Sequence, residues 1–163
     1  MSLYDTNLDK NNANYVPLTP LTFLKRAKEI YPNYEALIYE DRKFTWDQVY
    51  KRTVKFASAL NKIGIGKGDT VSFLAFNTPE IFEGHYSVPM TGAVLNTINI
   101  RLDAKTIAYI LDHSEAKVLV VDRQLHVEVK KALTTLKKKI TIIDINDKFA
   151  DQSKCEKIGE LEY

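Results

Sequence analysis

The sequence VPMTGAVLNTINIR, residues 88–101, joins the end of one amphipathic helix to a short apolar strand. Gly92 lets the chain leave that helix, because glycine adopts the left-handed conformation that ends many helices without steric cost. Residues 93–95 are short and apolar, and we expect them to be buried. Asp103 then marks the start of the next helix. This stretch predicts a helix–strand–helix junction of an α/β protein.

Strand-like and helix-like segments alternate on both sides of this junction. The run at residues 70–76 does not alternate strictly between apolar and polar residues, which is typical of a strand buried on both faces. The intervening helices are long enough to act as the right-handed crossovers that parallel strands require. We therefore predict an α/β fold in which helices flank one parallel sheet, built from residues 70–76, 93–98, 117–121 and 140–145.

The N-terminal part adds a helix, a hairpin and a second helix. Thr19, followed by proline, provides a capping hydroxyl and a favourable first helical residue. Residues 36–39 and 43–45 flank three polar residues, which predicts an N-terminal β-hairpin. Thr45 and Gln48 form a capping box at the start of a long amphipathic helix. At the other end of the chain, the apolar residues among positions 158–163 indicate the start of another helix.

Composition limits the classes of protein to consider. The 163 residues suffice for about one domain, and the 45% hydrophobic fraction indicates a globular chain. The net charge of +2 gives no electrostatic reason to expect a nucleic-acid partner. Cys155 is the single cysteine, so we expect no disulfide framework and a reducing compartment. No apolar run is long enough to span a membrane, and the polar N-terminus does not resemble a signal peptide. These features predict a cytoplasmic protein.

The glycine-rich segment at residues 64–68 invites comparison with a phosphate-binding loop. Such a loop follows a strand and opens a helix, so that backbone N–H groups face the phosphate. Here the segment follows a helix and opens a strand, which predicts a helix cap and a turn. The first buried strand is followed by residues 77–80, Asn-Thr-Pro-Glu, where a dinucleotide-binding protein would have glycines. The sequence therefore disfavours an ordinary dinucleotide site.

The three histidines do not form a recognisable catalytic set. We expect His85 to be packed on a helix face, His113 to lie in the last turn of its helix, and His126 to lie at an exposed helix start. Asp122 and Asp144 lie at or near strand ends, where α/β proteins bind ligands, although aspartate there is more often a helix cap. The lysine run at residues 137–139 indicates a solvated helix end.

Five motifs follow one another along the chain: Phe44-Thr45-Trp46 with Val49-Tyr50, residues 64–71 (GIGKGDTV), residues 77–80, residues 88–101 and residues 113–117 (HSEAK). In this order they resemble landmarks of the AMP-forming adenylating enzymes, a superfamily of acyl-CoA synthetases, luciferases and adenylation domains. The first of the five resembles the first core motif of that superfamily, and residues 88–101 resemble the second. Within the superfamily, residues 14–20 (NYVPLTP) and 88–97 resemble the short- and medium-chain acyl-CoA ligases, which include plant acyl-activating enzymes and 3-methylmercaptopropionyl-CoA ligases.

The resemblance implies the N-terminal part of an ATP-dependent ligase that joins a carboxylic acid to CoA and releases AMP and pyrophosphate. It implies ATP, Mg²⁺ and CoA for the complete enzyme and none of them for this chain alone. The phosphate loop, the adenine- and ribose-binding segments, the metal-binding glutamate and the catalytic lysine of the superfamily would lie beyond Tyr163. No catalytic, cofactor-binding or metal-binding residue is therefore carried over to this chain.

The resemblance also suggests a division of the chain. We expect a disordered tail at residues 1–14, a partial AMP-binding domain at 15–145 and a polar tail at 146–163. The expected partners are the carboxylic acid, ATP and CoA, through the missing part, and the remainder of the ligase. The chain alone is expected to expose apolar surface and to self-associate. The alternative is a stand-alone α/β binding or scaffold module derived from the family, whereas a small unrelated phosphate binder is disfavoured because the necessary glycine loops are absent.

Overall fold

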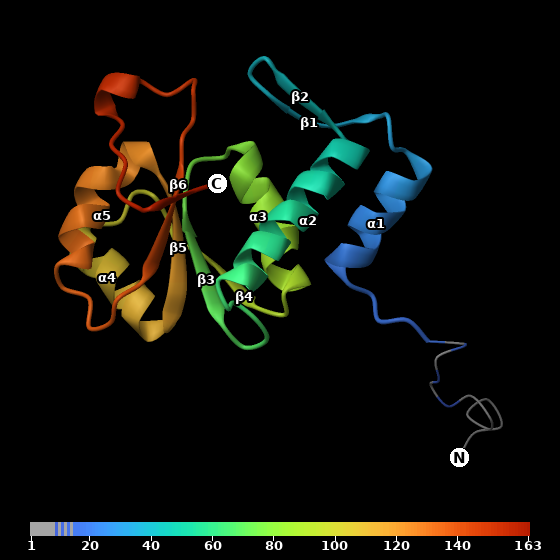
Figure 1. Cartoon of the computed structure of the whole chain (residues 1–163), viewed down its shortest axis with the longest axis horizontal. Helices are drawn as coiled ribbons and strands as arrows, with labels where there is room; N and C mark the ends of the chain where they lie inside the picture. Colours follow the sequence, from blue (N-terminus) through green and yellow to red (C-terminus); the bar gives the residue numbers. More distant parts are fainter. Residues whose placement is uncertain (1–8, 10, 12, 14) are drawn as a thin grey trace.

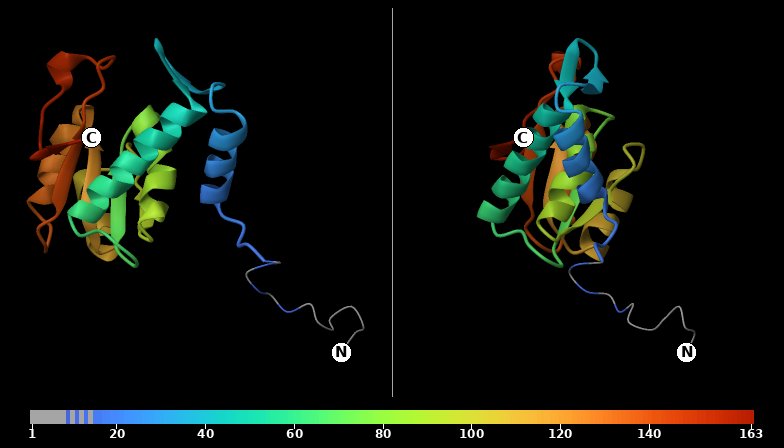
Figure 2. Two further views of the ribbon diagram at one scale, coloured as in Figure 1. Left: turned by 45° about the vertical axis from the view of Figure 1, so that its right-hand side comes forward. Right: turned by 90° about the vertical axis from the view of Figure 1, so that its right-hand side faces the viewer.

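A computed structural model describes residues 9, 11, 13 and 15–163 of the chain. Nearly all of the predicted disordered tail, residues 1–14, lies outside the described residues, so that expectation stays a prediction. The described part forms a central sheet between two layers of helices, with a helix and a hairpin to one side (Figures 1 and 2). None of the helices that the structure describes has both the length and the apolar character needed to cross a membrane.

The central sheet has five parallel strands in the order β4-β3-β5-β6-β7. It contains all four strands predicted from the sequence, which confirms the α/β fold and the single parallel sheet. The strands are β3 (Thr70–Leu74), β4 (Val94–Thr97), β5 (Ala116–Asp122), β6 (Thr141–Ile145) and β7 (Leu161–Glu162).

Alternating side chains of β5 enter two separate cores. Val118 and Val120 belong to one apolar cluster, whereas Leu119 and Val121 belong to the other. The first cluster is covered by α2 (Trp46–Lys62) and α3 (Pro79–Met90), and the second by α4 (Ala104–His113) and α5 (His126–Leu133). Figure 1 shows these two helix pairs on opposite sides of the sheet. Both faces of a parallel sheet need such cover, because its strands have no polar side to present to water.

The residues of the junction at 88–101 end α3 and form the edge strand β4. Gly92 has φ +81°, and a Cβ there would lie 3.3 Å from the Lys67 Cα, so glycine satisfies both the turn and the close approach. The expectation that residues 93–95 are buried is wrong for Val94, whose side chain is 56% exposed. The reason is topological, because β4 pairs only with β3 and leaves one edge open.

The local signals at the N-terminus are confirmed. Helix α1 (Pro20–Ile30) begins after Thr19, whose hydroxyl accepts a hydrogen bond from the Thr22 N–H. Strands β1 (Glu35–Tyr39) and β2 (Arg42–Thr45) form the predicted antiparallel hairpin. Thr45 and Gln48 make both hydrogen bonds of the capping box at the start of α2. These elements lie outside the central sheet and pack against the α2 side (Figure 2).

The C-terminal segment contradicts the sequence-based prediction. It forms the parallel strand β7 beside β6, not the start of a helix. Between β6 and β7 the chain forms one short 3₁₀ turn, η3 (Gln152–Lys154); a second such turn, η2 (Arg123–Leu125), joins β5 to α5. The carboxylate of Asp144 accepts hydrogen bonds from the backbone N–H groups of Ile158 and Gly159, which orients the last residues along the sheet. A Cβ at Gly159 would collide with the Ile142 carbonyl oxygen.

Candidate functional site

The glycine-rich segment forms a helix cap and a turn, as predicted. Gly64 and Gly68 both have φ +86°, a conformation that favours glycine. The Gly66 N–H donates to the Asp69 carboxylate at 2.9 Å, and Lys117 lies 2.5 Å from the same carboxylate. These two contacts, led by Lys117, lower the pKa of Asp69. The Gly66 N–H is thus already used within the segment, which precedes strand β3 and does not open a helix.

The three histidines lie apart and have different environments. His85 is exposed and its Nδ1 lies 2.8 Å from the Ile81 carbonyl oxygen, so the expectation that it is packed is wrong. His113 does lie in the last turn of α4, where it stacks on Tyr109. His126 begins α5, but its side chain is only 18% exposed, because it contacts the Arg123 carbonyl oxygen and approaches Glu156. The structure brings no two of these side chains together.

Asp122 and Asp144 act as caps within the fold. Asp122 accepts a hydrogen bond from the Gln124 N–H at 2.9 Å and so caps η2. Its other carboxylate oxygen is buried with no hydrogen-bond partner among the described residues. Burial is the main cause that raises the pKa of Asp122. Asp144 does not cap a helix, because its carboxylate accepts hydrogen bonds from the N–H groups of Ile158 and Gly159 in the loop before β7. Residues 137–139 are exposed, but they lie in the loop after α5 and not at its end.

The structure contains a buried charge network that the sequence analysis missed. Glu83 on α3 is fully buried and accepts two hydrogen bonds from Arg52 on α2, one from Nε and one from Nη2 at 3.1 Å. The Tyr163 hydroxyl donates to the second Glu83 carboxylate oxygen at 2.9 Å. One helical turn away, Glu80 accepts a hydrogen bond from Arg42 at 2.8 Å. The network thereby joins the hairpin, two helices and the C-terminal strand.

Burial and ion pairing have opposite effects on the pKa values of Glu83 and Arg52 in this network. Burial raises the pKa of Glu83, and the contacts with Arg52 oppose that effect. Burial alone would lower the pKa of Arg52, but its hydrogen bond and proximity to Glu83 outweigh burial and raise it. Burial beside Glu83 raises the pKa of Tyr163 well above its ordinary value. The Arg42 and Arg52 guanidinium groups also lie 5.1 and 5.0 Å from the Phe44 ring centre, within range of a cation–π contact.

The network holds elements together and offers no obvious chemistry. Both oxygens of Glu83 are occupied, so it cannot act as a free base. Within residues 9, 11, 13 and 15–163, no three His, Cys, Asp or Glu side chains lie close enough to hold a metal ion. A sequence signal did exist, since Glu80 and Glu83 are spaced three apart and so share one face of the helix. Their partners, however, are distant along the chain and could not be identified by spacing.

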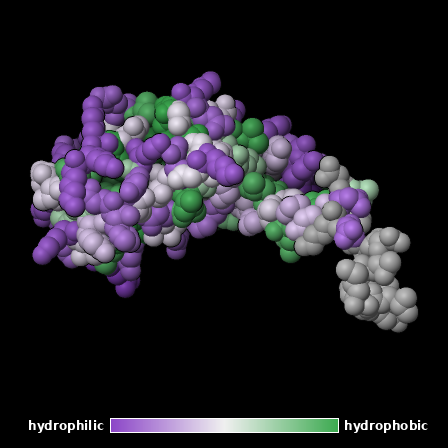
Figure 3. All heavy atoms as spheres, turned by 90° about the horizontal axis from the view of Figure 1, so that it is seen from below, coloured by the Kyte–Doolittle hydropathy of each residue, from purple (hydrophilic) through white to green (hydrophobic). Residues whose placement is uncertain are grey.

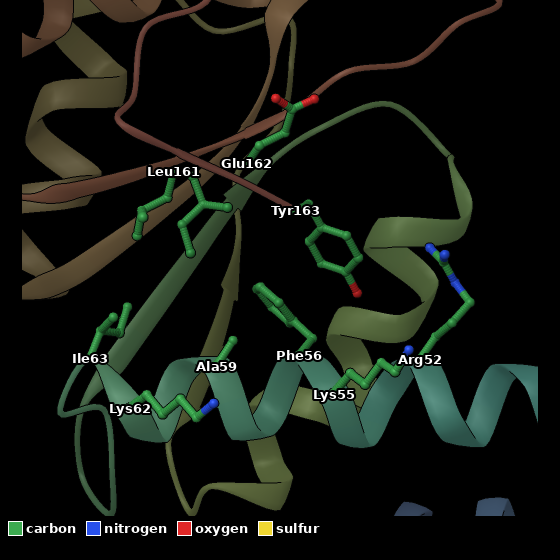
Figure 4. A pocket seen from close by; sticks show the side chains of 10 residues that line it. Arg52, Lys55, Phe56, Ala59, Lys62, Ile63, Leu161, Glu162 and Tyr163 are labelled. Atoms are coloured by element: carbon green, nitrogen blue, oxygen red, sulfur yellow. The ribbon is translucent and has the colours of Figure 1, made fainter.

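A groove of about 440 Å³ opens beside the network, between α2 and β7. Figure 4 shows Tyr163 pointing from the C-terminal strand toward α2, whereas Glu162 points away from that helix. The Tyr163 ring packs against Phe56, with ring centres 4.2 Å apart. The groove has an apolar floor and a rim that carries basic side chains. Its lining consists of Arg52, Lys55, Phe56, Ala59, Lys62, Ile63, Ile143, Leu161, Glu162 and Tyr163.

Comparison with protein families and with curated proteins places these features in context. The family model described as "AMP-binding enzyme" matches residues 24–162. Trans-cinnamate:CoA ligase of Petunia hybrida is 55% identical over 129 residues, covering 79% of this chain and 23% of the relative. Butyrate–CoA ligase AAE11 of Arabidopsis thaliana is 54% identical, covering 78% of the chain and 22% of the relative. Acetate–CoA ligase CCL3 of Humulus lupulus is 42% identical, covering 96% of the chain and 29% of the relative.

Solved structures agree on the fold. The anthranilate CoA ligase AuaEII has a TM-score of 0.75 at 24% identity, covering 80% of this chain and 25% of that one. A benzoate CoA ligase from Burkholderia xenovorans has a TM-score of 0.71 at 22% identity, covering 76% of this chain and 25% of that one. The chain thus spans about a quarter of the length of the curated relatives it matches. Together with the match over residues 24–162, the relatives show that the chain belongs to the AMP-binding enzyme family, beside the acyl-CoA ligases of plants.

Proposed function

We propose that this chain is the N-terminal segment of an ATP-dependent, AMP-forming acyl-CoA ligase. The complete enzyme would convert a carboxylic acid, ATP and CoA into acyl-CoA, AMP and pyrophosphate. The observation that carries the proposal is the 55% identity to a plant CoA ligase over 129 residues. The short- or medium-chain acid class follows from the resemblance to the same group of ligases. The particular acid stays open, because no residue of this segment is assigned to the acyl site.

The described residues do not fit the cofactors that the family implies. ATP needs donors aligned on its phosphates, but the segment at 64–68 directs the Gly66 N–H at its own Asp69. Mg²⁺ needs oxygen ligands gathered at one place, and the described part of the chain lacks such a group. We therefore derive no catalytic step from these residues. That this segment has no catalytic, cofactor-binding or metal-binding residue, and no activity alone, stays a prediction.

Two further proposals concern the segment as a folding unit. We keep the division into residues 1–14, 15–145 and 146–163 as a proposal. We also propose that the isolated chain self-associates or needs the remainder of the ligase, because large apolar side chains remain exposed. Those near the N-terminus include Val16, Leu18, Phe23 and Ile30. Figure 3 shows apolar residues interrupting a largely hydrophilic surface on one face. Sedimentation velocity of the isolated chain tests this proposal, and a sharp monomer that binds no hydrophobic dye would contradict it.

The compartment is a separate question. Cytoplasmic location stays a prediction. The names of the Petunia and Arabidopsis relatives place those two enzymes in the peroxisome.

A chimera tests the ligase proposal directly. The matched 129 residues of the Petunia ligase are replaced by the corresponding residues of this chain. We expect the chimera to form the trans-cinnamate CoA thioester and to catalyse cinnamate-dependent ATP–pyrophosphate exchange, because the segment supplies the same fold. The isolated chain should show exchange at the level of a buffer blank. A folded chimera without activity would contradict the ligase proposal, and exchange by the isolated chain would contradict the prediction of inactivity.

The stand-alone module is the second candidate. It is favoured by one observation, that helices cover both faces of the central sheet. A cooperative unfolding transition of a monomeric isolated chain, combined with an inactive chimera, would favour it over the ligase segment.

A further inference from the structure

Asp122 lies where the order of the strands in the central sheet reverses. It is the last residue of β5, and β5 pairs with one edge of β3 while β4 pairs with the other. Open α/β sheets bind ligands at the carboxyl ends of two such strands. In this protein the Asp122 side chain occupies that place and is fully buried. A titratable group therefore lies, out of contact with water, at the end of the sheet where a ligand is expected.

The surroundings of Asp122 favour its protonated form. One carboxylate oxygen accepts hydrogen bonds from the backbone N–H and the side-chain amide of Gln124, at 2.9 and 3.3 Å. The other oxygen has no hydrogen-bond partner among the described residues. Burial is the main cause that raises the pKa of Asp122, and the carboxylates of Asp147 and Glu80 raise it further. A buried charge without a partner is costly, whereas a protonated carboxyl is neutral.

The positive charges at this end of the sheet are paired with other carboxylates. Arg42 contacts Glu80 at 2.8 Å, Arg123 contacts Glu162 at 3.1 Å, and Lys148 contacts Asp41 at 3.3 Å. Asp122 itself forms no ion pair with any residue that the structure describes. Its neighbours thus include two carboxylates and no cation that pairs with it.

The β1–β2 hairpin is tied to the segment that follows β6. The Tyr39 hydroxyl donates to the buried Asp147 at 2.5 Å, and the Tyr39 ring packs edge-on against Phe149 with ring centres 5.8 Å apart. Lys148 adds its ion pair with Asp41 in the turn of the hairpin. Both views of Figure 2 show the hairpin and the segment after β6 at the same end of the molecule. An isolated two-stranded hairpin is marginally stable in water, so its closure depends on contacts of this kind.

Tyr39 also links the hairpin to Asp122. Burial and the hydrogen bond to Asp147 raise the pKa of the Tyr39 hydroxyl, and the negative charges of Glu40 and Asp122 contribute. Burial is the main cause that raises the pKa of the Cys155 thiol, with Asp122 the next. Neither the hydroxyl nor the thiol therefore loses its proton in the acidic to neutral range. The Asp122 carboxyl, in contrast, can change its charge within that range.

We propose that Asp122 is a proton-binding switch, which keeps the β1–β2 hairpin closed over the end of the sheet while its carboxyl is protonated and lets the hairpin open when the proton is released. The proton passes to solvent and leaves a carboxylate that lacks a partner in the closed form. Movement of Asp147 and the hairpin away from β5 relieves the repulsion between the two carboxylates and admits water to Asp122, because Asp147 is the group that the Tyr39 hydroxyl contacts. The switch is a property of this segment and does not depend on ligase activity.

Amide hydrogen exchange of the 163-residue chain, read by mass spectrometry, tests the proposal. Exchange rates of residues 36–45, in the hairpin, and 116–122, in β5, are each divided by the intrinsic rate at the same pH. The β5 segment reports global unfolding, so the ratio of the two protection factors isolates opening of the hairpin. We expect protection of the hairpin relative to β5 to fall by about tenfold or more between about pH 4 and 7, since one unit of pKa difference between closed and open forms gives a factor of ten. A ratio that does not change with pH overturns the proposal.

Two variants separate Asp122 from other titrating groups. Asp122→Asn keeps a neutral side chain at this position, and its hairpin should be as protected at about pH 7 as that of the wild type at about pH 4. Asp147→Asn keeps an acceptor for the Tyr39 hydroxyl but removes the repelled charge, so the dependence on pH should weaken. Asp103→Asn is the matched control, because Asp103 also caps a helix, accepting hydrogen bonds from the Lys105 and Thr106 N–H groups of α4. The control should keep the wild-type dependence on pH.

The outcomes of these variants decide the proposal. If Asp122→Asn keeps the wild-type dependence on pH, another group controls the hairpin and the proposal is wrong. If Asp122→Asn does not fold, Asp147→Asn decides, and an unchanged dependence on pH in that variant overturns the proposal. Loss of the dependence in Asp103→Asn as well would show a general effect of stability and would equally overturn it. None of these readings uses ligase activity, so the ligase proposal can fail or stand independently.

Discussion

The two faces of the central sheet are closed in different ways. The face under α4 and α5 is packed by apolar side chains such as Ile107, Leu119 and Val129. The face under α2 and α3 has an apolar core as well, but it also buries Glu83 and leaves an open groove beside Tyr163. Apolar packing needs only suitable size and position, whereas a buried carboxylate needs partners with defined geometry. The second face therefore depends on contacts between segments that are distant in the sequence.

The largest expected effect comes from leaving Glu83 without its cation. We expect Arg52→Met to lower the free energy of unfolding by about 3–5 kcal/mol, because an uncompensated buried charge is costly. The measurement is urea unfolding followed by circular dichroism. In the double variant Arg52→Met with Glu83→Gln, most of the loss should be recovered, because the buried charge is removed too. If the double variant is no more stable than the single one, the pairing of Arg52 with Glu83 does not stabilise this face of the sheet.

Truncation of the apolar face should cost slightly less and should act independently. Ile107→Ala removes a side chain that is 1% exposed, and we expect a loss of about 3 kcal/mol from transfer and cavity terms. When Ile107→Ala is added to the double variant Arg52→Met with Glu83→Gln, the loss of stability should equal the sum of the two separate losses to within about 0.5 kcal/mol. The reason is that the two sites share no partners. A clearly larger deviation from additivity would show that the two faces are coupled across the sheet.

Removal of one hydroxyl tests how much the C-terminal strand contributes to the network. Tyr163→Phe keeps the ring on Phe56 but removes the hydrogen bond to Glu83. We expect a loss of about 1.5–3 kcal/mol, the usual range for a hydrogen bond to a charged group. Tyr34→Phe is the control, because its exposed side chain contacts Tyr31 through its ring. Equal effects of the two substitutions would show that the Tyr163 hydroxyl adds no specific stability.

The smallest effect concerns Asp122, which follows Val118 and Val120 on the network side of β5. Burial raises its pKa in the folded state above the ordinary 3.8. A carboxyl with a raised folded pKa binds its proton more tightly in the native state, so its stabilising contribution is complete at low pH and falls as pH rises through that pKa. We therefore expect the stability of Asp122→Asn, relative to the wild type, to increase as the pH rises from about 4 to 7.

Asparagine can keep the cap on η2, so this comparison isolates the charge. Urea unfolding at several pH values measures the difference between the two proteins. A difference that is independent of pH would contradict the direction of the pKa shift. Asp144→Asn cannot serve as a control, because the Asp144 carboxylate orients residues 158 and 159.

The sequence alone determined the elements whose signals are local. The Thr45–Gln48 box, the proline after Thr19 and the left-handed glycines depend on neighbours a few residues away, so spacing suffices to find them. The four apolar runs predicted the parallel sheet for the same reason, since alternation with helices leaves few topologies. The family motifs extended that prediction to an expected ligase segment.

The tertiary structure alone decided which strand lies at an edge and which charges meet. Nothing in residues 93–95 shows that Val94 has a neighbour on only one side, because strand order is a property of the whole sheet. The segment at 158–163 has too few residues to show a period, and its strand form depends on Asp144 and on the free edge of β6. Arg52, Glu83 and Tyr163 are separated by 31 and 80 residues. Only packing of α2, α3 and β7 brings them together, because burial of Glu83 requires partners that no local pattern specifies.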